Sequence, residues 1–241
     1  MVFETLKERW ILIGKIIAET PLHIGRGRGE RELLEPDLPV IKLPDGRVYI
    51  PGSSLKGAIR SELDRLVKGL GFRLCISSEP RYKCSPPNLC ISCTLFGSTE
   101  VGSRIVFRDA ISSSTDTFQR VGIAIDRESK KVVTGALYEG EYVPPGAEFN
   151  LEIVAENPEK WMIGLLWICM ENLVGVGGQI SRGAGKVRIE LSKIEIYTPE
   201  SIIEQRAERV IDDPKPLIEE CKAEFKKSLD VLKEKFGRKE V

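Results

Sequence analysis

The sequence predicts an α+β fold with a ferredoxin-like (RRM-like) core. Two segments have the 3.6-residue apolar period of helices, and four others are β-branched or alternate apolar with polar residues. They follow the order strand, helix, strand, strand, helix, strand: residues 10–19, 53–68, 104–111, 147–155, 157–170 and 186–196. That order defines the ferredoxin-like unit, so the intervening residues are predicted to be insertions.

The first strand and the first helix are separated by a long connection. Residues 10–19 are too short for a lone buried helix and are predicted to form a central strand. Glycines and prolines break residues 20–50 into an extended, partly hairpin-like insertion. Ser53 is a suitable N-cap for the helix that follows, in which apolar residues recur at helical spacing: Leu55, Ile59, Leu63 and Leu66.

Two insertions follow the first helix. Residues 71–100 hold four cysteines and three prolines, and residues 112–145 contain a candidate hairpin at about 126–137. The second helix is predicted to have Asn157 as its N-cap and Pro158 as its first residue. A glycine-rich turn at 175–185 then leads to the last strand, where alternate residues share one face: Val187, Ile189 and Leu191.

The composition changes at Pro199, so we expect a core domain over residues 1–198 and a helical C-terminal extension over 199–241. The extension is rich in charge but carries one apolar stripe, which predicts that it docks on another surface. The stripe consists of Ile218, Cys221, Phe225, Leu229, Leu232 and Phe236.

Composition narrows the class of protein. Lys and Arg total 36, as do Asp and Glu, so the net charge of zero neither favours nor excludes a polyanionic partner. No segment has the length and apolarity of a signal peptide or membrane span, so we expect a cytoplasmic protein with no membrane partner. In that compartment the six cysteines are metal ligands or reduced buried thiols rather than disulfides.

The spacing of four cysteines indicates a metal site. Cys75, Cys84, Cys90 and Cys93 form a C-x8-C-x5-C-x2-C pattern, whose final C-x2-C lets two thiolates reach one tetrahedral ion. We predict structural Zn²⁺, with reduced thiols lining a loop as the alternative. Four thiolates close the coordination shell, so such an ion has no open position for hydrolysis.

Several basic and glycine-rich segments are candidate phosphate contacts. Free backbone N–H groups begin the first helix near Ser53 and Ser54, and Lys56 and Arg60 follow one turn apart. A solvated basic helix face is the alternative. Flexible backbone and cations also combine around Arg182 and Lys186 in the glycine-rich turn, and around Arg26 and Arg28 in the GRGRG segment, which is otherwise a hairpin tip.

No nucleotide-cofactor motif is present, since the sequence lacks a Walker pattern and a dinucleotide-binding fingerprint. His23 is the only histidine, which excludes histidine-based catalysis unless His23 itself takes part. Its position at the end of the first strand favours a local structural hydrogen bond.

Several motifs in order resemble the RAMP superfamily of CRISPR proteins. They are TPLHIG at 20–25, YIPGSSLKG at 49–57, CISCTLFG at 90–97, IDR at 125–127, GALY at 135–138, VPPG at 143–146 and GGQISRGAG at 177–185. The resemblance covers residues 10–196. It is greatest to the backbone subunit of type III (Csm/Cmr-like) effector complexes, several copies of which stack along a guide RNA.

The resemblance implies partners and a chemistry. It implies binding of crRNA and complementary target RNA, assembly with other effector subunits and with copies of this chain, and a hairpin thumb near residues 126–137, where Arg127 lies. It also implies a loop carboxylate that assists Mg²⁺- or Mn²⁺-dependent cleavage of target RNA. Asp37 occupies the matching position, with Glu35 as an alternative. A purely structural RNA-binding subunit, or a guide-processing ribonuclease using His23, would share most of these motifs.

Overall fold

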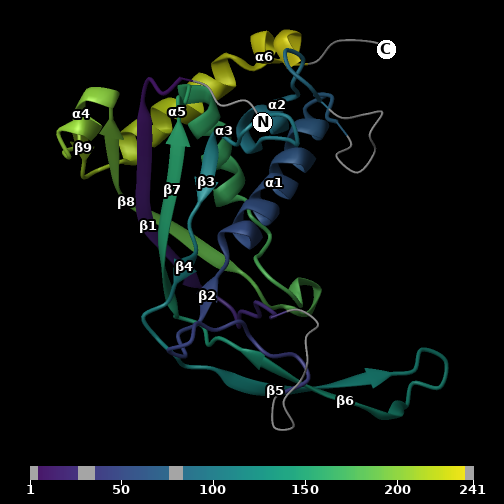
Figure 1. Cartoon of the computed structure of the whole chain (residues 1–241). Coiled ribbons are helices and arrows are strands. Elements are labelled where there is room, and N and C mark those ends of the chain that lie inside the picture. The colour runs from purple at the N-terminus through teal and green to yellow at the C-terminus, as the bar shows by residue number, and fades with distance from the viewer. Residues whose placement is uncertain (1–4, 27–35, 76–83, 237–241) are drawn as a thin grey trace.

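The computed structural model describes residues 5–26, 36–75 and 84–236. A five-stranded antiparallel sheet forms the centre of the molecule, in the order β3-β7-β1-β8-β9. Figure 1 shows this sheet with helices packed along it. The strands are β1 (Arg9–Ala18), β3 (Ile105–Phe107), β7 (Glu148–Glu156), β8 (Val187–Tyr197) and β9 (Arg209–Ile211).

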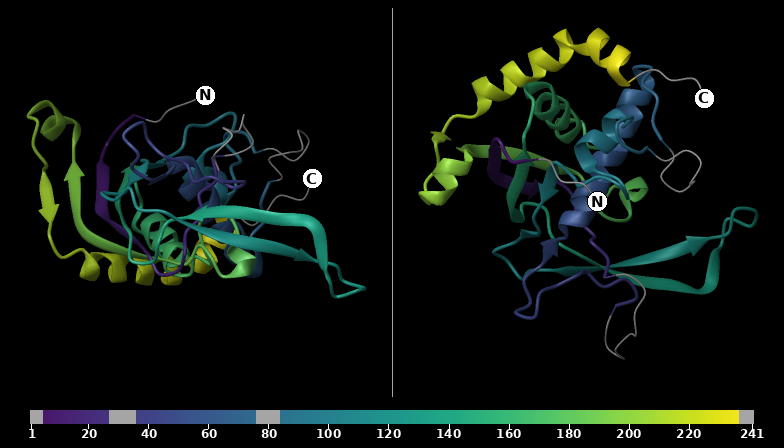
Figure 2. Two further views of the ribbon diagram at one scale, coloured as in Figure 1. Left: turned by 90° about the horizontal axis from the view of Figure 1, so that it is seen from below. Right: turned by 45° about the horizontal axis from the view of Figure 1, so that its top comes forward.

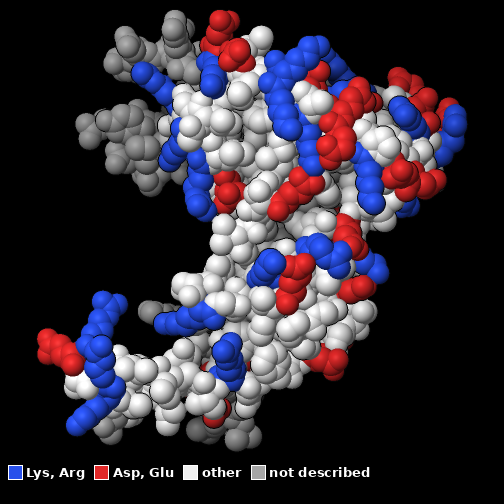
Figure 3. All heavy atoms as spheres, turned by 180° about the vertical axis from the view of Figure 1, so that it is seen from behind, with Lys and Arg blue, Asp and Glu red and all other residues white. Residues whose placement is uncertain are grey.

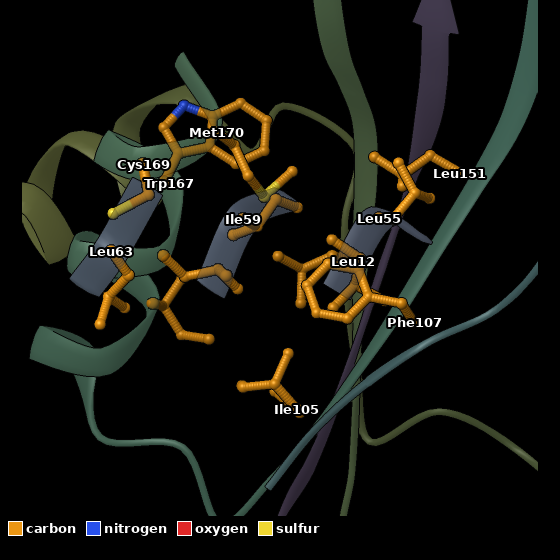
Figure 4. Close-up of a cluster of buried hydrophobic side chains, with 14 of the residues drawn as sticks. Leu12, Leu55, Ile59, Leu63, Ile105, Phe107, Leu151, Trp167, Cys169 and Met170 are labelled. Atoms are coloured by element: carbon orange, nitrogen blue, oxygen red, sulfur yellow. The ribbon is translucent and has the colours of Figure 1, made fainter. Parts of the chain in front are cut away.

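The predicted ferredoxin-like core is confirmed. The elements β1, α1 (Gly52–Gly69), β3, β7, α3 (Lys160–Glu171) and β8 follow one another in the expected order, and β1 is central, paired with β7 and β8. Alternate residues of β1 are buried, and they meet the apolar sides of α1 and α3. Figure 4 shows this core, in which Leu12 of β1 lies near Leu55 and Ile59 of α1.

The last strand keeps its apolar residues on one face, opposite the buried residues of β1, although their spacing along the sequence changes halfway. Val187, Ile189 and Leu191 share one face as predicted, but a β-bulge shifts the pairing with β1 at Ile13 and Gly14. Beyond the bulge the buried residues are Ile194 and Ile196. The Oγ of Ser192 donates a hydrogen bond to the Ile13 carbonyl within this irregularity.

Three local predictions were wrong. Helix α1 begins at Gly52 with Pro51 at the N-cap, so Ser53 lies in the first turn instead of capping it. Helix α3 has Glu159 at its N-cap. Asn157 instead holds the N-terminal segment, accepting hydrogen bonds from the backbone N–H groups of Lys7 and Glu8.

The third error concerns the predicted strand at 104–111. It divides into β3 and β4 (Ala110–Ile111), and β4 pairs with β2 (Tyr49–Ile50) in a separate two-stranded sheet. Between β3 and β4, the Arg108 N–H still donates to the Glu152 carbonyl of β7, and the Asp109 carboxylate accepts a hydrogen bond from the Gly52 N–H at the start of α1.

The insertion at 112–145 forms a long hairpin, termed the thumb below. Its strands are β5 (Phe118–Ile125) and β6 (Val132–Tyr142), so the hairpin is longer than the predicted 126–137. Figures 1 and 2 show it projecting away from the main sheet. Its outer part is exposed, including the apolar side chains of Val121, Ile123 and Leu137.

The C-terminal extension packs on the core. It contains α4 (Pro199–Ile203), strand β9 at the sheet edge, α5 (Lys215–Lys227) and α6 (Leu229–Phe236). As predicted, the apolar stripe docks: Ile218, Cys221 and Phe225 are buried beside α3. The helices approach so closely that a Cβ on Gly164 of α3 would lie 2.1 Å from the Cys221 carbonyl oxygen. The described helices include none long and apolar enough to span a membrane.

Candidate functional site

The four cysteines of the predicted metal site converge. Their Sγ atoms all lie within 4.8 Å of one another, although residues 76–83 between the first two are outside the described residues. Cys90 caps helix α2 (Ile91–Phe96) and Cys93 lies in its first turn, so the C-x2-C pair is presented by a helix start. This all-thiolate set suits a metal ion such as Zn²⁺.

Backbone hydrogen bonds reach two of the four sulfurs. The backbone N–H of Cys90 donates to the Sγ of Cys84 at 3.2 Å, and that of Cys93 donates to the Sγ of Cys90 at 3.5 Å. A hydrogen bond from the Cys93 side chain lowers the pKa of Cys90, whereas burial raises the pKa of Cys84 to about 12 and the hydrogen bond to Cys90 raises the pKa of Cys93. Cys169 and Cys221 are separate buried thiols, and burial raises the pKa of both, to about 12 and about 11.

The Arg60 side chain faces this cluster. Its Nη2 lies 3.6 Å from the Sγ of Cys93, and its guanidinium lies over the ring of Phe96. Lys56, one turn earlier, is half-buried; burial lowers its pKa, and the charge of Arg60 lowers it further. The two predicted phosphate ligands on this helix therefore have different surroundings.

The carboxylate of Asp109 occupies the start of α1. The Gly52 N–H donates to the Oδ1 of Asp109 at 2.8 Å, so this N–H is not available to a phosphate. The N–H groups of Ser54 and Leu55 both donate to the Pro51 carbonyl. Ser53 is exposed, and Ser54 is half-buried at the edge of a groove.

That groove, of about 680 Å³, runs between α1 and the glycine-rich loop and is called the α1 groove below. Its walls are mostly small residues, which leave backbone accessible to a ligand: Gly25, Ser54, Gly57, Ala58, Ser61, Gly175, Gly177 and Gly178. Gly177 has φ +84°, and a Cβ there would lie 2.3 Å from the His23 carbonyl oxygen. Glycine is required because the loop packs directly on this backbone.

Asp37 is joined to the base of the thumb. Its Oδ2 accepts a hydrogen bond from the backbone N–H of Glu139 at 3.0 Å. Leu38 exchanges backbone hydrogen bonds with Glu139 and Glu141, which makes residue 38 a short parallel partner of β6 at Gly140. The predicted catalytic carboxylate is thus attached to a regular strand. Glu35 is outside the described residues.

A buried carboxylate holds the Asp37 segment in place. Glu141 is 8% exposed, and its carboxylate accepts from the Val40 N–H at 2.9 Å, the Lys42 Nζ at 2.5 Å and the Thr117 Oγ1 at 2.6 Å. Burial alone raises the pKa of Glu141, but the hydrogen bonds from Lys42, Thr117 and Val40 outweigh it and hold the pKa below its ordinary value. Glu141 was not predicted from the sequence, where its only signal is an acidic residue at an inward position of a strand.

His23 lies under the same junction. Its Nδ1 is 2.8 Å from the Glu141 carbonyl oxygen, which can only accept, so Nδ1 carries the proton. The ring is buried and packs against Tyr142, and the His23 carbonyl accepts from the Gly178 N–H. These contacts are the local hydrogen bonding expected of a structural histidine.

A smaller pocket of about 220 Å³ lies between the thumb base and the glycine-rich loop, and is called the thumb pocket below. The thumb contributes Arg120, Tyr138 and Tyr142, and the loop contributes Gln179 and Arg182. Arg182 lies at the end of the 3-10 helix η2 (Ile180–Arg182) and donates to the Gln179 side chain. Arg182 was predicted from the sequence, but the thumb residues were not, because only the pairing of β5 with β6 brings them together.

The other predicted RNA-binding cations are dispersed. The Arg26 N–H donates to the Pro39 carbonyl, which places Arg26 beside the Asp37 segment. Lys186 forms an exposed ion pair with Glu19. Arg127 lies in the exposed turn at the tip of the thumb, and Arg28 is outside the described residues. Figure 3 shows a hollow between the thumb and the body, with Lys and Arg side chains on both sides.

Comparison with known proteins assigns the family. The RAMP superfamily model matches residues 15–188. A protein of Methanocaldococcus jannaschii named CRISPR system Cms endoribonuclease Csm3 is 30% identical over 210 residues, which cover 79% of this chain and 82% of that protein. Proteins of the same name from Methanothermobacter thermautotrophicus and Enterococcus italicus are 29% and 30% identical, covering 78% and 76% of this chain and 86% and 91% of theirs. The chain belongs to the RAMP superfamily.

Proposed function

We propose that this chain is the guide-binding backbone subunit of a type III CRISPR effector complex and that it cleaves RNA complementary to the guide. The observation that carries the proposal is the attachment of Asp37 to the thumb base by the hydrogen bond from the Glu139 N–H. The relatives named as endoribonucleases support the reaction class. Partners would be crRNA, target RNA, other effector subunits and further copies of this chain.

The two pockets suit the backbone and bases of single-stranded RNA. In the α1 groove, glycine and serine residues let a sugar-phosphate chain approach the protein backbone. In the thumb pocket, Tyr138 offers a stacking surface beside Arg120 and Arg182. Such contacts do not depend on base identity, as required of a protein whose specificity resides in its guide.

The proposed cleavage is an in-line transesterification. A 2′-hydroxyl of the target attacks the adjacent phosphorus, and the bond from phosphorus to the 5′-oxygen breaks, leaving a 2′,3′-cyclic phosphate and a 5′-hydroxyl. Asp37 would hold Mg²⁺ or Mn²⁺, which would stabilise charge on the phosphate. The hydrogen bond from the Glu139 N–H holds the Asp37 carboxylate in place, which supports this role. One carboxylate is enough for such a cation, because Mg²⁺ keeps most of its water ligands.

In this proposal residues 1–198 form the RNA-binding unit and 199–241 extend it. Arg26, Ser53, Ser54, Lys56, Arg127, Arg182 and Lys186 are proposed RNA contacts, and Arg28 remains a prediction from sequence. The cysteine cluster, as a closed zinc centre, would hold the loop around α2 and take no part in cleavage.

The deciding experiment assembles the complex on a guide RNA and follows complementary RNA with Mg²⁺ or Mn²⁺. Asp37→Asn keeps an oxygen acceptor for the Glu139 N–H but removes the charge, so it should bind guide normally and lose cleavage. Asp45→Asn, at an exposed ion pair with Arg47, is the control and should cleave normally. Unchanged cleavage by Asp37→Asn would leave the chain as a purely structural subunit.

The guide-processing alternative has its own test. The buried His23 ring is already hydrogen-bonded to Glu141, which favours a structural role over general base catalysis. Cleavage of repeat RNA by the wild-type chain, lost in His23→Gln, would instead support that alternative.

A further inference from the structure

Arg60 makes three contacts, all with one short segment. Its Nη2 is 3.6 Å from the Sγ of Cys93, its Nη1 is 3.4 Å from the Gly97 carbonyl oxygen, and its Cζ is 5.9 Å from the ring centroid of Phe96. Arg60 also lines a cavity of about 260 Å³ together with Cys75, Cys84 and Cys93. The guanidinium is therefore engaged at the cysteine cluster.

Each of three sulfurs has its own N–H donor. The Sγ of Cys84 receives the backbone N–H of Cys90, and the Sγ of Cys90 receives that of Cys93. The Sγ of Cys93 receives the guanidinium of Arg60. The side chain thus supplies to Cys93 the kind of donor that the chain's own backbone supplies to the other two.

Charge gives a second reason for an arginine here. Four thiolates around one Zn²⁺ leave a net charge of about −2, which is costly in a partly buried site. The guanidinium of an arginine carries a positive charge on a planar fork that can bind a sulfur and a carbonyl oxygen together. It offsets part of the charge from within hydrogen-bonding distance.

We propose that Arg60 is a positioning residue of the metal centre, which donates to the Cys93 thiolate, offsets the charge of the cluster and ties its loop to α1. The proposal rests on the cysteines holding zinc, and it replaces the expectation that Arg60 contacts RNA. Arg60 is on the opposite side of α1 from Ala58, roughly 200° around the helix, so the same helix carries the metal loop and the α1 groove.

The test measures zinc stoichiometry and zinc transfer to a chromogenic chelator in the full chain. Arg60→Met keeps an unbranched stem against Phe96 but removes the charge and donors, so the zinc dissociation constant should rise about 10- to 100-fold. Arg60→Lys keeps the charge without the fork and should lie between wild type and Arg60→Met. Arg65→Met is the control, since Arg65 is on the same helix, pairs with Glu62 and should leave zinc affinity unchanged.

Folding is checked by circular dichroism in saturating zinc, where all four proteins should coincide; if Arg60→Met does not fold, Arg60→Lys carries the comparison. Equal zinc affinity in wild type and in the Arg60 variant used would overturn the proposal, as would an equal loss in Arg65→Met. A fall in guide-RNA affinity with unchanged zinc affinity would return Arg60 to RNA binding. A wild-type chain that binds no zinc would refute the metal centre but leave the Asp37 cleavage assay unaffected.

Discussion

The Oδ2 of Asp37 accepts a hydrogen bond from the backbone N–H of Glu139, across 3.0 Å and 102 residues of sequence. This bond holds the Asp37 carboxylate in a defined place relative to strand β6. Because β6 is also one of the two strands of the thumb, RNA that contacts the thumb would lie at a defined distance and direction from Asp37. Two residues further on, Glu141 secures the same loop from beneath.

Removing the Glu141 carboxylate should destabilise the chain. Glu141→Ala leaves the buried Val40 N–H without its acceptor, which we expect to lower the free energy of unfolding by about 1–3 kcal/mol. Lys42 adds little to this loss because its side chain is 35% exposed and can turn to water. Urea unfolding measures the change. Glu139→Gln, at an exposed neighbour, is the control, and an equal loss there would contradict the assignment.

The same carboxylate should make stability depend on pH. The pKa of Glu141 is lower in the folded chain than its ordinary value of 4.5, so its ionised form is favoured by folding. Its contribution is complete above the unfolded pKa and is lost as pH falls through the folded pKa. The stability difference between wild type and Glu141→Gln should be constant above about pH 5.5 and shrink in acid. A stability difference between the two proteins that grows in acid would contradict the lowered pKa of Glu141.

The thumb pocket should contribute stacking and charge to RNA binding. Tyr138→Ala should weaken guide affinity roughly 5- to 150-fold, the range for loss of one base-aromatic stack. Arg182→Ala should weaken it less and reduce the salt dependence by about one phosphate contact. Fluorescence anisotropy at several salt concentrations separates the two. Tyr197→Ala, which is outside the pocket, is the control; equal losses at Tyr138 and Tyr197 would argue against a pocket-specific contact.

Docking of the C-terminal extension should depend on Gly164. A Cβ at this position would collide with the Cys221 backbone, so Gly164→Ala must separate α3 from α5, and we expect a loss of about 1–3 kcal/mol. Gly57→Ala is a matched change inside α1, where a Cβ meets nothing within 4 Å; it should stabilise the chain by up to about 1 kcal/mol. Thermal unfolding measures both. A neutral Gly164→Ala would show that α5 shifts freely.

The local sequence pattern predicted most helices and strands, but it did not predict where they begin and end. The apolar period of Leu55, Ile59 and Leu63 predicts helix α1 because burial of one side is itself the cause of that period. The predicted N-caps were wrong because a side chain that could cap a helix can also accept hydrogen bonds from backbone N–H groups elsewhere in the fold. Asn157 fits an N-cap by residue type, but the N–H groups of Lys7 and Glu8, 149 or more residues away, take its side chain instead.

The sequence by itself determined the ferredoxin-like order, the four-cysteine site and the motifs of the family, since each is carried by spacing along the chain. Only the tertiary structure decided that Asp37 is joined to β6, that Glu141 holds its loop, and that Arg60 faces the cysteines. The physical reason is that these groups meet through strand pairing and helix packing between distant segments. No local period or propensity records which side chain a buried carboxylate or thiolate will find across such a distance.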